Sequence, residues 1–145
     1  MIPKFRAWVK PGVLSNHLDG VIAEAKPDFL GMNCLVKRND LVGKDCFTEI
    51  VDFDDVILMQ STGLKDKNGV EIYAGDIVQS TWYDVDNNPY KKKGEITYAG
   101  AQYVIAYDSQ FDVETGEITY DAHSLSYAEN PEVIGNIYTN PELLS

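Results

Sequence analysis

The sequence of 145 residues lacks most of the features by which an enzyme or a membrane protein is recognised. No apolar run approaches the ~20 residues of a membrane span, and the start lacks the continuous apolar stretch of a signal peptide. No nucleophile is accompanied by a base, and no phosphate-binding loop or metal-ligand cluster is present. We therefore predict a cytoplasmic protein that is not an enzyme. It should have no catalytic residues, no cofactor, no metal and no membrane partner.

Cysteine and histidine are scarce as well. Cys34 and Cys46 are the two cysteines, without C-x-x-C spacing and without a histidine close by in the sequence, which disfavours a zinc site. We expect both cysteines to be reduced and at least partly buried, because no export signal precedes them. His17 and His123 are far apart in the sequence, and neither has a recognisable catalytic setting. We expect ordinary structural roles for both histidines.

Basic residues are missing from residues 94–145, which contain no Lys or Arg. The net charge of −11 is made up of −2 on residues 1–93 and −9 on residues 94–145. Phosphate backbones need basic partners, so this field repels nucleic acid and makes duplex DNA an unlikely partner. We interpret the acidic stretch as a solvated surface. An alternative is an acidic, DNA-mimic-like decoy that occupies the basic site of a host DNA-binding protein.

One basic cluster is present, Lys91–Lys93, with Trp82, Tyr83 and Tyr90 close by in the sequence. Aromatic residues beside basic ones are typical of surfaces that bind single-stranded nucleic acid. The sequence therefore also allows a nucleic-acid-associated regulatory protein that uses this hairpin. Three solvated lysines near an exposed hairpin tip are the favoured interpretation, because the surrounding charge is negative.

A calcium-like pattern follows Tyr83. Asp84, Asp86, Asn88 and Glu95 occupy positions 1, 3, 5 and 12 of an EF-hand loop. Position 6 is Pro89, where the sharp turn of that loop requires glycine. We therefore predict a plain loop between strands and no calcium site.

The most informative segment is residues 59–78. Asn68-Gly69 is a strong hairpin signal and predicts a type I′ turn, in which both central residues have positive φ. Asp66 can accept hydrogen bonds from nearby backbone amides and favours the turn. A short strand is expected at Ile72-Tyr73, a break at Ala74-Gly75-Asp76, and a new strand over Ile77–Tyr83, which is β-branched and aromatic.

Further short strands are predicted along the chain, separated by turn signals. They are Phe5–Val9, Leu30–Val36, Cys46–Val51, Val56–Gln60, Gly94–Tyr98, Ala101–Tyr107, Glu117–Tyr120 and Val133–Tyr138. The continuous apolar run at Val56–Gln60 indicates a strand buried on both faces. Residues 13–25 allow a hairpin around Asp19-Gly20 or a short helix, and glycine in a helix interior favours the hairpin. Asn140-Pro141 predicts one helical turn to Leu144. No internal repeat is visible.

Several blocks of the sequence resemble the YopX family of phage and prophage proteins. They lie at the start, the middle and the end of the chain. The blocks are Lys4–Trp8, Asp55–Gln60, Thr62–Gly69, Ile72-Tyr73, Gly75–Val78, Val133–Tyr138 and Asn140–Leu144. The resemblance implies a mainly β protein with an SH3-like small barrel and an origin in a bacteriophage or prophage. It implies no established activity and no site residues.

We therefore predict an all-β (mainly β) fold. Residues 1–58 should form an N-terminal β-rich extension and residues 59–145 an SH3-like barrel with a short C-terminal helical turn, packed as one compact unit. The predicted function is that of a phage or prophage accessory protein. It would act in the cytoplasm of the bacterial host as a non-catalytic module that binds a macromolecule, most plausibly a protein. A homo-oligomer is also compatible with the sequence.

Overall fold

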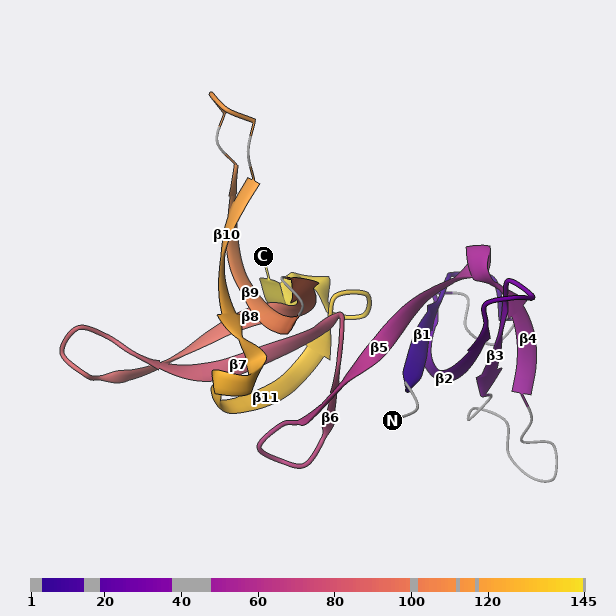
Figure 1. The fold of residues 1–145 in the computed structure, drawn as a ribbon, viewed down its shortest axis with the longest axis horizontal. Helices are drawn as coiled ribbons and strands as arrows, with labels where there is room; N and C mark the ends of the chain where they lie inside the picture. The colour runs from indigo at the N-terminus through magenta and orange to yellow at the C-terminus, as the bar shows by residue number, and fades with distance from the viewer. Residues whose placement is uncertain are drawn as a thin grey trace. The chain divides into compact units, whose positions relative to one another are not determined.

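The chain folds almost entirely into antiparallel strands (Figure 1). The computed structural model describes residues 4–14, 19–37, 48–99, 102–111, 113–116 and 118–144. Two compact units follow each other along the chain, residues 1–61 and residues 62–145. The boundary predicted from the sequence, between residues 58 and 59, lies a few residues earlier.

The first unit is built on strands in the order β4-β3-β2-β1-β5. Strands β1 to β4 form a meander, and β5 returns to pair with β1. The elements are β1 (Phe5–Val9), β2 (Val21–Asp28), β3 (Asn33–Lys37), β4 (Thr48–Asp52), the 3-10 helix η1 (Phe53–Asp55) and β5 (Val56–Lys65). Strand β5 continues past the end of this unit and pairs there with β6 (Glu71–Tyr73).

The core of the first unit is supplied by alternate positions of the strands, as expected where one face of a sheet is covered. Its buried residues are Ala7, Val9, Leu14, Ala23, Ala25, Cys34, Val36, Val51 and Val56. Cys34 is completely buried, and this burial raises the pKa of its thiol, although a backbone hydrogen bond at Lys26 partly offsets the effect. Cys46 and His17 lie outside the described residues.

The second unit is built on strands in the order β10-β9-β8-β7-β11. Its core contains Ile72, Val78, Ile96, Ile105, Tyr107 and Leu125. The elements are β6, β7 (Asp76–Tyr83), β8 (Pro89–Ala99), β9 (Gln102–Phe111), β10 (Ile118–Ser124), η2 (Leu125–Tyr127), β11 (Glu129–Asn136) and η3 (Pro141–Leu144). Figure 1 shows that the β7–β8 and β9–β10 hairpins extend from this sheet in different directions.

The two units share one connectivity, although the sequence shows no repeat. In each unit four strands form a meander, a short 3-10 helix follows, and a fifth strand returns to pair with the first. The helix is η1 between β4 and β5, and η2 between β10 and β11. In both units the second edge of the first meander strand is therefore paired with the fifth strand, β1 with β5 and β7 with β11.

The mainly β fold predicted from the sequence is confirmed, but the sheets are open rather than closed into a barrel. In the described part of the second unit, β10 and β11 are the two outer strands and do not pair with each other. The outer edge of β11 is occupied by the turn after β5, because the Lys67 amide donates to the Pro131 carbonyl and the Val133 amide donates to Asp66. The predicted helical turn is present as η3.

Two local predictions need correction. Residues 21–25 do form a strand, but its partner is β1, with Val9 opposite Val21, and the helical alternative is wrong there. Of the proposed partner strand, Val13–Leu18, residues 13 and 14 are not in a strand and residues 15–18 lie outside the described residues. The run at Val56–Gln60 is a strand but is not buried on both faces, because Ile57 is 38% exposed. An antiparallel sheet commonly leaves one face open to solvent, which an apolar run alone does not reveal.

Candidate functional site

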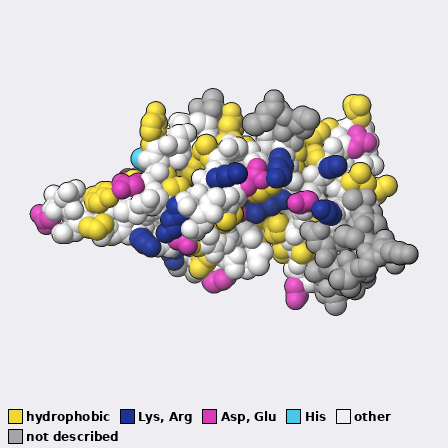
Figure 2. Space-filling model, turned by 90° about the horizontal axis from the view of Figure 1, so that it is seen from below, with side chains coloured by type: hydrophobic (Ala, Val, Ile, Leu, Met, Phe, Trp, Pro, Cys, Tyr) yellow, Lys and Arg dark blue, Asp and Glu magenta, His cyan; other side chains and the backbone are white. Residues whose placement is uncertain are grey.

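The β7–β8 hairpin carries a continuously exposed segment, residues 83–91, which we call the arm. Its strands pair in register from Ile77 opposite Glu95 out to Tyr83 opposite Pro89. Val85 is fully exposed, and Tyr83 and Tyr90 are 45% and 44% exposed. Figure 2 shows hydrophobic and acidic side chains along the projecting hairpin, with basic side chains, which in this unit are all lysines, beside its base.

The tip of the arm is held by Asp84. Its Oδ1 accepts hydrogen bonds from the amides of Asp86 at 2.9 Å and Asn88 at 2.8 Å. The Asp84 amide donates to the Asn88 carbonyl, and the Asn87 amide donates to the Asp84 carbonyl. Asn87 has a φ of 64°, and asparagine tolerates this left-handed conformation better than most residues. The tip is therefore a defined turn whose backbone is held by four hydrogen bonds.

The calcium-like pattern is not gathered in space. Asp84 follows Tyr83 at the tip, whereas Glu95 lies opposite Ile77, six positions before Tyr83 in β7. At ~3.3 Å per residue, this separation is about 20 Å. Oδ1 of Asp84 is also occupied by the two amides of its own turn. The four residues therefore cannot surround one cation in this hairpin.

An aromatic cluster lies at the base of the arm. The Tyr107 hydroxyl and the Ser80 hydroxyl are 2.8 Å apart, and the indole N–H of Trp82 donates to both, at 2.9 Å and 3.2 Å. Trp82 also packs edge-on against Tyr107 and His123, with ring centroids 5.2 Å apart in each pair. His123 thus packs against Trp82 in this cluster.

The three lysines do not form one patch. Alternation along β8 places Lys92 on one face and Lys91 and Lys93 on the other. The ammonium of Lys92 lies 4.6 Å from the ring centroid of Tyr107 and 5.1 Å from that of Trp82, which is a cation–π arrangement. Lys92 is thus bound within its own protein.

The other two lysines lie in rows with acidic residues. Thr81 of β7 lies between Lys91 of β8 and Glu129 of β11. Lys93 and Glu132 flank Gln79 in the same way. The arm is joined to β11 as well, because the Tyr83 hydroxyl donates to Glu129 at 2.7 Å, and this hydrogen bond raises the pKa of Tyr83.

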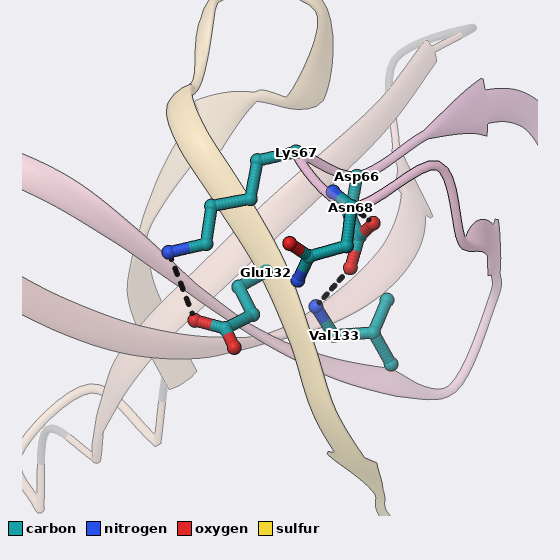
Figure 3. Close-up of polar contacts among 5 residues, drawn as sticks. All are labelled: Asp66, Lys67, Asn68, Glu132 and Val133. Carbon is teal, nitrogen blue, oxygen red and sulfur yellow. Dashed lines mark hydrogen bonds and ion pairs between the residues drawn. The ribbon is translucent and has the colours of Figure 1, made fainter.

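The second cluster of polar contacts centres on Asp66, in the block that the sequence marks as most informative (Figure 3). Asp66 is 7% exposed. Its Oδ1 accepts the amides of Asn68 at 2.8 Å and Val70 at 2.9 Å, and its Oδ2 accepts the amide of Val133 at 2.9 Å. Next to it, Lys67 forms an ion pair with Glu132 at 3.2 Å. The turn is thereby fastened to β11.

The turn type predicted for Asn68-Gly69 is wrong. Gly69 has a φ of 81°, but Asn68 is not among the residues with positive φ, as a type I′ turn requires. The Gly69 amide donates to the Asp66 carbonyl, and the Asp66 amide donates to the Val70 carbonyl. This is a type I turn followed by a left-handed glycine, a common three-residue hairpin loop. The Asp84 turn repeats the same four hydrogen bonds, with Asn87 in the place of Gly69.

Two opposing effects act on the pKa of Asp66. Burial raises the pKa of this carboxyl group, because it disfavours the charged form. The amides of Val133, Val70 and Asn68, together with the charge of Lys67, lower it, and the net result is a pKa below the ordinary value for aspartate. The hydrogen bonds that fasten the turn to β11 thus favour the charged form of this carboxylate.

Comparisons with known proteins gave matches that cover essentially the whole chain. A family model described as "YopX protein" matches residues 4–145. The crystal structure of protein EF1440 from Enterococcus faecalis is similar, with a TM-score of 0.54 and 28% sequence identity, covering 100% of this chain and 99% of that one. A comparison with curated proteins gave no match. Within the described residues, no helix is long and apolar enough to cross a membrane.

Proposed function

Because this chain belongs to the YopX family, we propose that it is a phage or prophage accessory protein that binds a macromolecule in the cytoplasm of a bacterial host. We propose further that the partner is a protein, that binding involves no catalysis, and that the arm is the binding surface. Phage origin is what the sequence resemblance implies. The cytoplasmic location and the absence of catalysis are further parts of this proposal and remain to be tested by experiment.

The arm is the single observation that carries this proposal. Loop tips in soluble proteins are commonly polar, yet here Val85 is fully exposed and Tyr83 and Tyr90 are about half exposed. Tyrosine is enriched at protein interfaces because its ring packs while its hydroxyl stays hydrogen-bonded. The turn at Asp84 fixes the tip, so little conformational entropy is lost when a partner binds.

A capture experiment from bacterial lysate, read by mass spectrometry, tests this proposal. The wild type is compared with the double variant Val85→Ser/Tyr90→Ser, and Val113→Ser is the matched control because Val113 is 85% exposed on a different hairpin. We expect a protein that is captured by the wild type and by Val113→Ser but not by the arm variant. Equal capture by all three, with unchanged melting temperatures, would contradict the role of the arm.

Binding of nucleic acid through Lys91–Lys93 is the second candidate. The aromatic cluster beside Lys92 favours it, because stacked aromatics and basic groups together bind single strands. The division of the lysines between two faces argues against it, as do the rows that they share with Glu129 and Glu132. A gel shift with single-stranded DNA separates the two candidates, and competition by this protein for a host DNA-binding protein tests the acidic-decoy hypothesis.

A further inference from the structure

The turn that fastens β11 contains a dipeptide with a chemistry of its own, Asn68-Gly69. Asparagine is among the chemically labile residues, and it is most labile before glycine, because no side chain shields the backbone nitrogen that follows it. The sequence contains this pair once. Both residues are exposed, and a Cβ built on Gly69 would meet nothing within 4 Å. Neither burial nor crowding therefore protects the pair.

The reaction open to this pair is spontaneous deamidation. The Gly69 nitrogen, after losing its proton to solvent, attacks the side-chain carbonyl carbon Cγ of Asn68 and forms a new C–N bond that closes a succinimide ring. The bond from Cγ to the side-chain nitrogen breaks, and that nitrogen takes up a proton and leaves as ammonia. Water then opens the ring at either carbonyl. One opening gives aspartate, and the other gives isoaspartate, in which the main chain runs through the side chain.

The folded turn opposes this reaction. The Gly69 amide donates to the Asp66 carbonyl at 3.0 Å, so the proton that must leave is held in a hydrogen bond. The Asn68 amide donates to Oδ1 of Asp66 at 2.8 Å, which fixes the backbone on the other side of the reacting carbon. Ring closure would also rotate the main chain of Asn68 away from its place in a type I turn. The Asn68 carboxamide itself is not held by the other residues drawn in Figure 3.

An isoaspartate would not fit this turn. The amides of Asp66 and Val70 each donate to the other residue, at 2.8 Å and 2.9 Å, and an extra main-chain carbon between them would change their spacing. Both contacts with β11 start from the same turn. The Val133 amide donates to Oδ2 of Asp66 at 2.9 Å, and the Lys67 amide donates to the Pro131 carbonyl at 2.8 Å. Modification of Asn68 therefore loosens the hold of the turn on β11.

We propose that Asn68 is a site of spontaneous deamidation and that the Asp66 turn sets its rate. The reaction proceeds from the opened turn, so its rate follows the equilibrium of local opening. Water is the only co-reactant. The isoaspartate product cannot close the turn again, and β11 stays less firmly held. The turn thus limits the time for which the second unit keeps its full stability.

The test incubates the full chain at mildly alkaline pH and follows each asparagine by peptide mass spectrometry, with isoaspartate separated from aspartate by chromatography. In the chain unfolded by urea, Asn68 should react faster than Asn87, an exposed asparagine followed by Asn88 instead of glycine. In the folded wild type, Asn68 should react more slowly than in the unfolded chain. The aged wild type should melt at a lower temperature than the fresh protein, whereas aged Asn68→Ser should not.

Two variants separate local opening from global unfolding. Asp66→Ala should be modified about tenfold faster than the wild type, because it removes the acceptor of the Asn68 and Val70 amides. Gly94→Ala crowds β9 and leaves the turn in place, so it should react at nearly the wild-type rate well below its melting temperature. Asp66→Asn keeps an acceptor and should give an intermediate rate, and it carries the same comparison where Asp66→Ala does not fold.

An equal rate at Asn68 in the folded wild type and the unfolded chain would overturn the proposal. So would an unchanged rate in both Asp66 variants. Equal acceleration by Gly94→Ala would assign the reaction to global unfolding and remove the role of the turn. An aged protein that is modified at Asn68 but keeps its melting temperature would refute the loosening of β11.

Discussion

Replacing Asp66 by alanine should destabilise the protein more than any other single change at its surface turns. The variant leaves the Val133 amide without its acceptor at the point where β11 meets the turn, and an unsatisfied buried donor costs about 1–3 kcal/mol. The amides of Asn68 and Val70 can turn to water, and the loss of each hydrogen bond costs about 0.5–1 kcal/mol. We expect a total of about 3 kcal/mol, which lowers the melting temperature of a unit of this size by roughly 15 °C.

The chain contains its own control for this experiment. Asp84 accepts the same two local hydrogen bonds in the same kind of turn, but it is exposed. Asp84→Ala should therefore cost only about 1 kcal/mol. Urea denaturation measures both variants, and hydrogen exchange of the Val133 amide reports the lost contact directly. If Asp66→Ala and Asp84→Ala cost the same, the fastening of β11 by Asp66 has no energetic weight and the reasoning fails.

Asp66 also predicts a dependence of stability on pH. Its pKa in the folded protein is below the ordinary value, so its contribution is fully present above the pKa of the unfolded chain, about 3.9. The contribution is lost as the pH falls through the lower folded value. The wild type should lose more stability than Asp66→Ala between pH 5 and pH 2, measured by urea denaturation. Parallel curves would contradict this assignment.

The remaining predictions concern glycines, calcium and DNA. Gly69→Val should lower the free energy of unfolding by about 1–2 kcal/mol, because a β-branched side chain is strained at a φ of 81°, even though a Cβ there meets nothing within 4 Å. An unchanged melting temperature would count against this prediction. Gly94→Ala should lower the free energy of unfolding by about 2 kcal/mol or more for a different reason, since its Cβ would lie 2.7 Å from a backbone oxygen of β9. A stability near that of the wild type would refute the close approach. Calcium should not change the melting temperature, because Asp84 and Glu95 are far apart along the hairpin, and a calcium-dependent rise would revive a metal site. Random duplex DNA should bind no more tightly than ~10⁻⁴ M at physiological salt, and micromolar binding that is lost on mutating Lys91–Lys93 to glutamate would promote the nucleic-acid candidate.

The positions of most strands could be predicted because their signals are local. Gly75 breaks the chain between β6 and β7 as expected, and Asn140-Pro141 starts the final helical turn. The turn type at Asn68-Gly69 could not be predicted with the same success, because Asn-Gly fits two hairpin loops that differ in one φ angle.

The pairing of distant strands was not predictable from the sequence. The most important contact of Asp66 comes from Val133, 67 residues later, and nothing in either segment specifies the other. The same holds for the outer edge of β11, which the Asp66 turn occupies. The exposed loop before β3 was not predicted, for a simpler reason. Leu30 and Met32 belong to the apolar run Leu30–Val36, which predicts a strand, but β3 begins only at Asn33 and both side chains are exposed.

The connectivity that both units share has a consequence for the chain while it is being synthesised. In each unit, one edge of the first strand of the meander, β1 or β7, stays unpaired until the fifth strand, β5 or β11, has been made. One edge of β7 therefore stays unpaired until β11 has been made, and β11 starts 46 residues after Tyr83. At roughly 5–20 residues per second, that edge is open for several seconds on the ribosome. The contact between Asp66 and the Val133 amide joins two segments 67 residues apart, so it too can form only after β11 has been made.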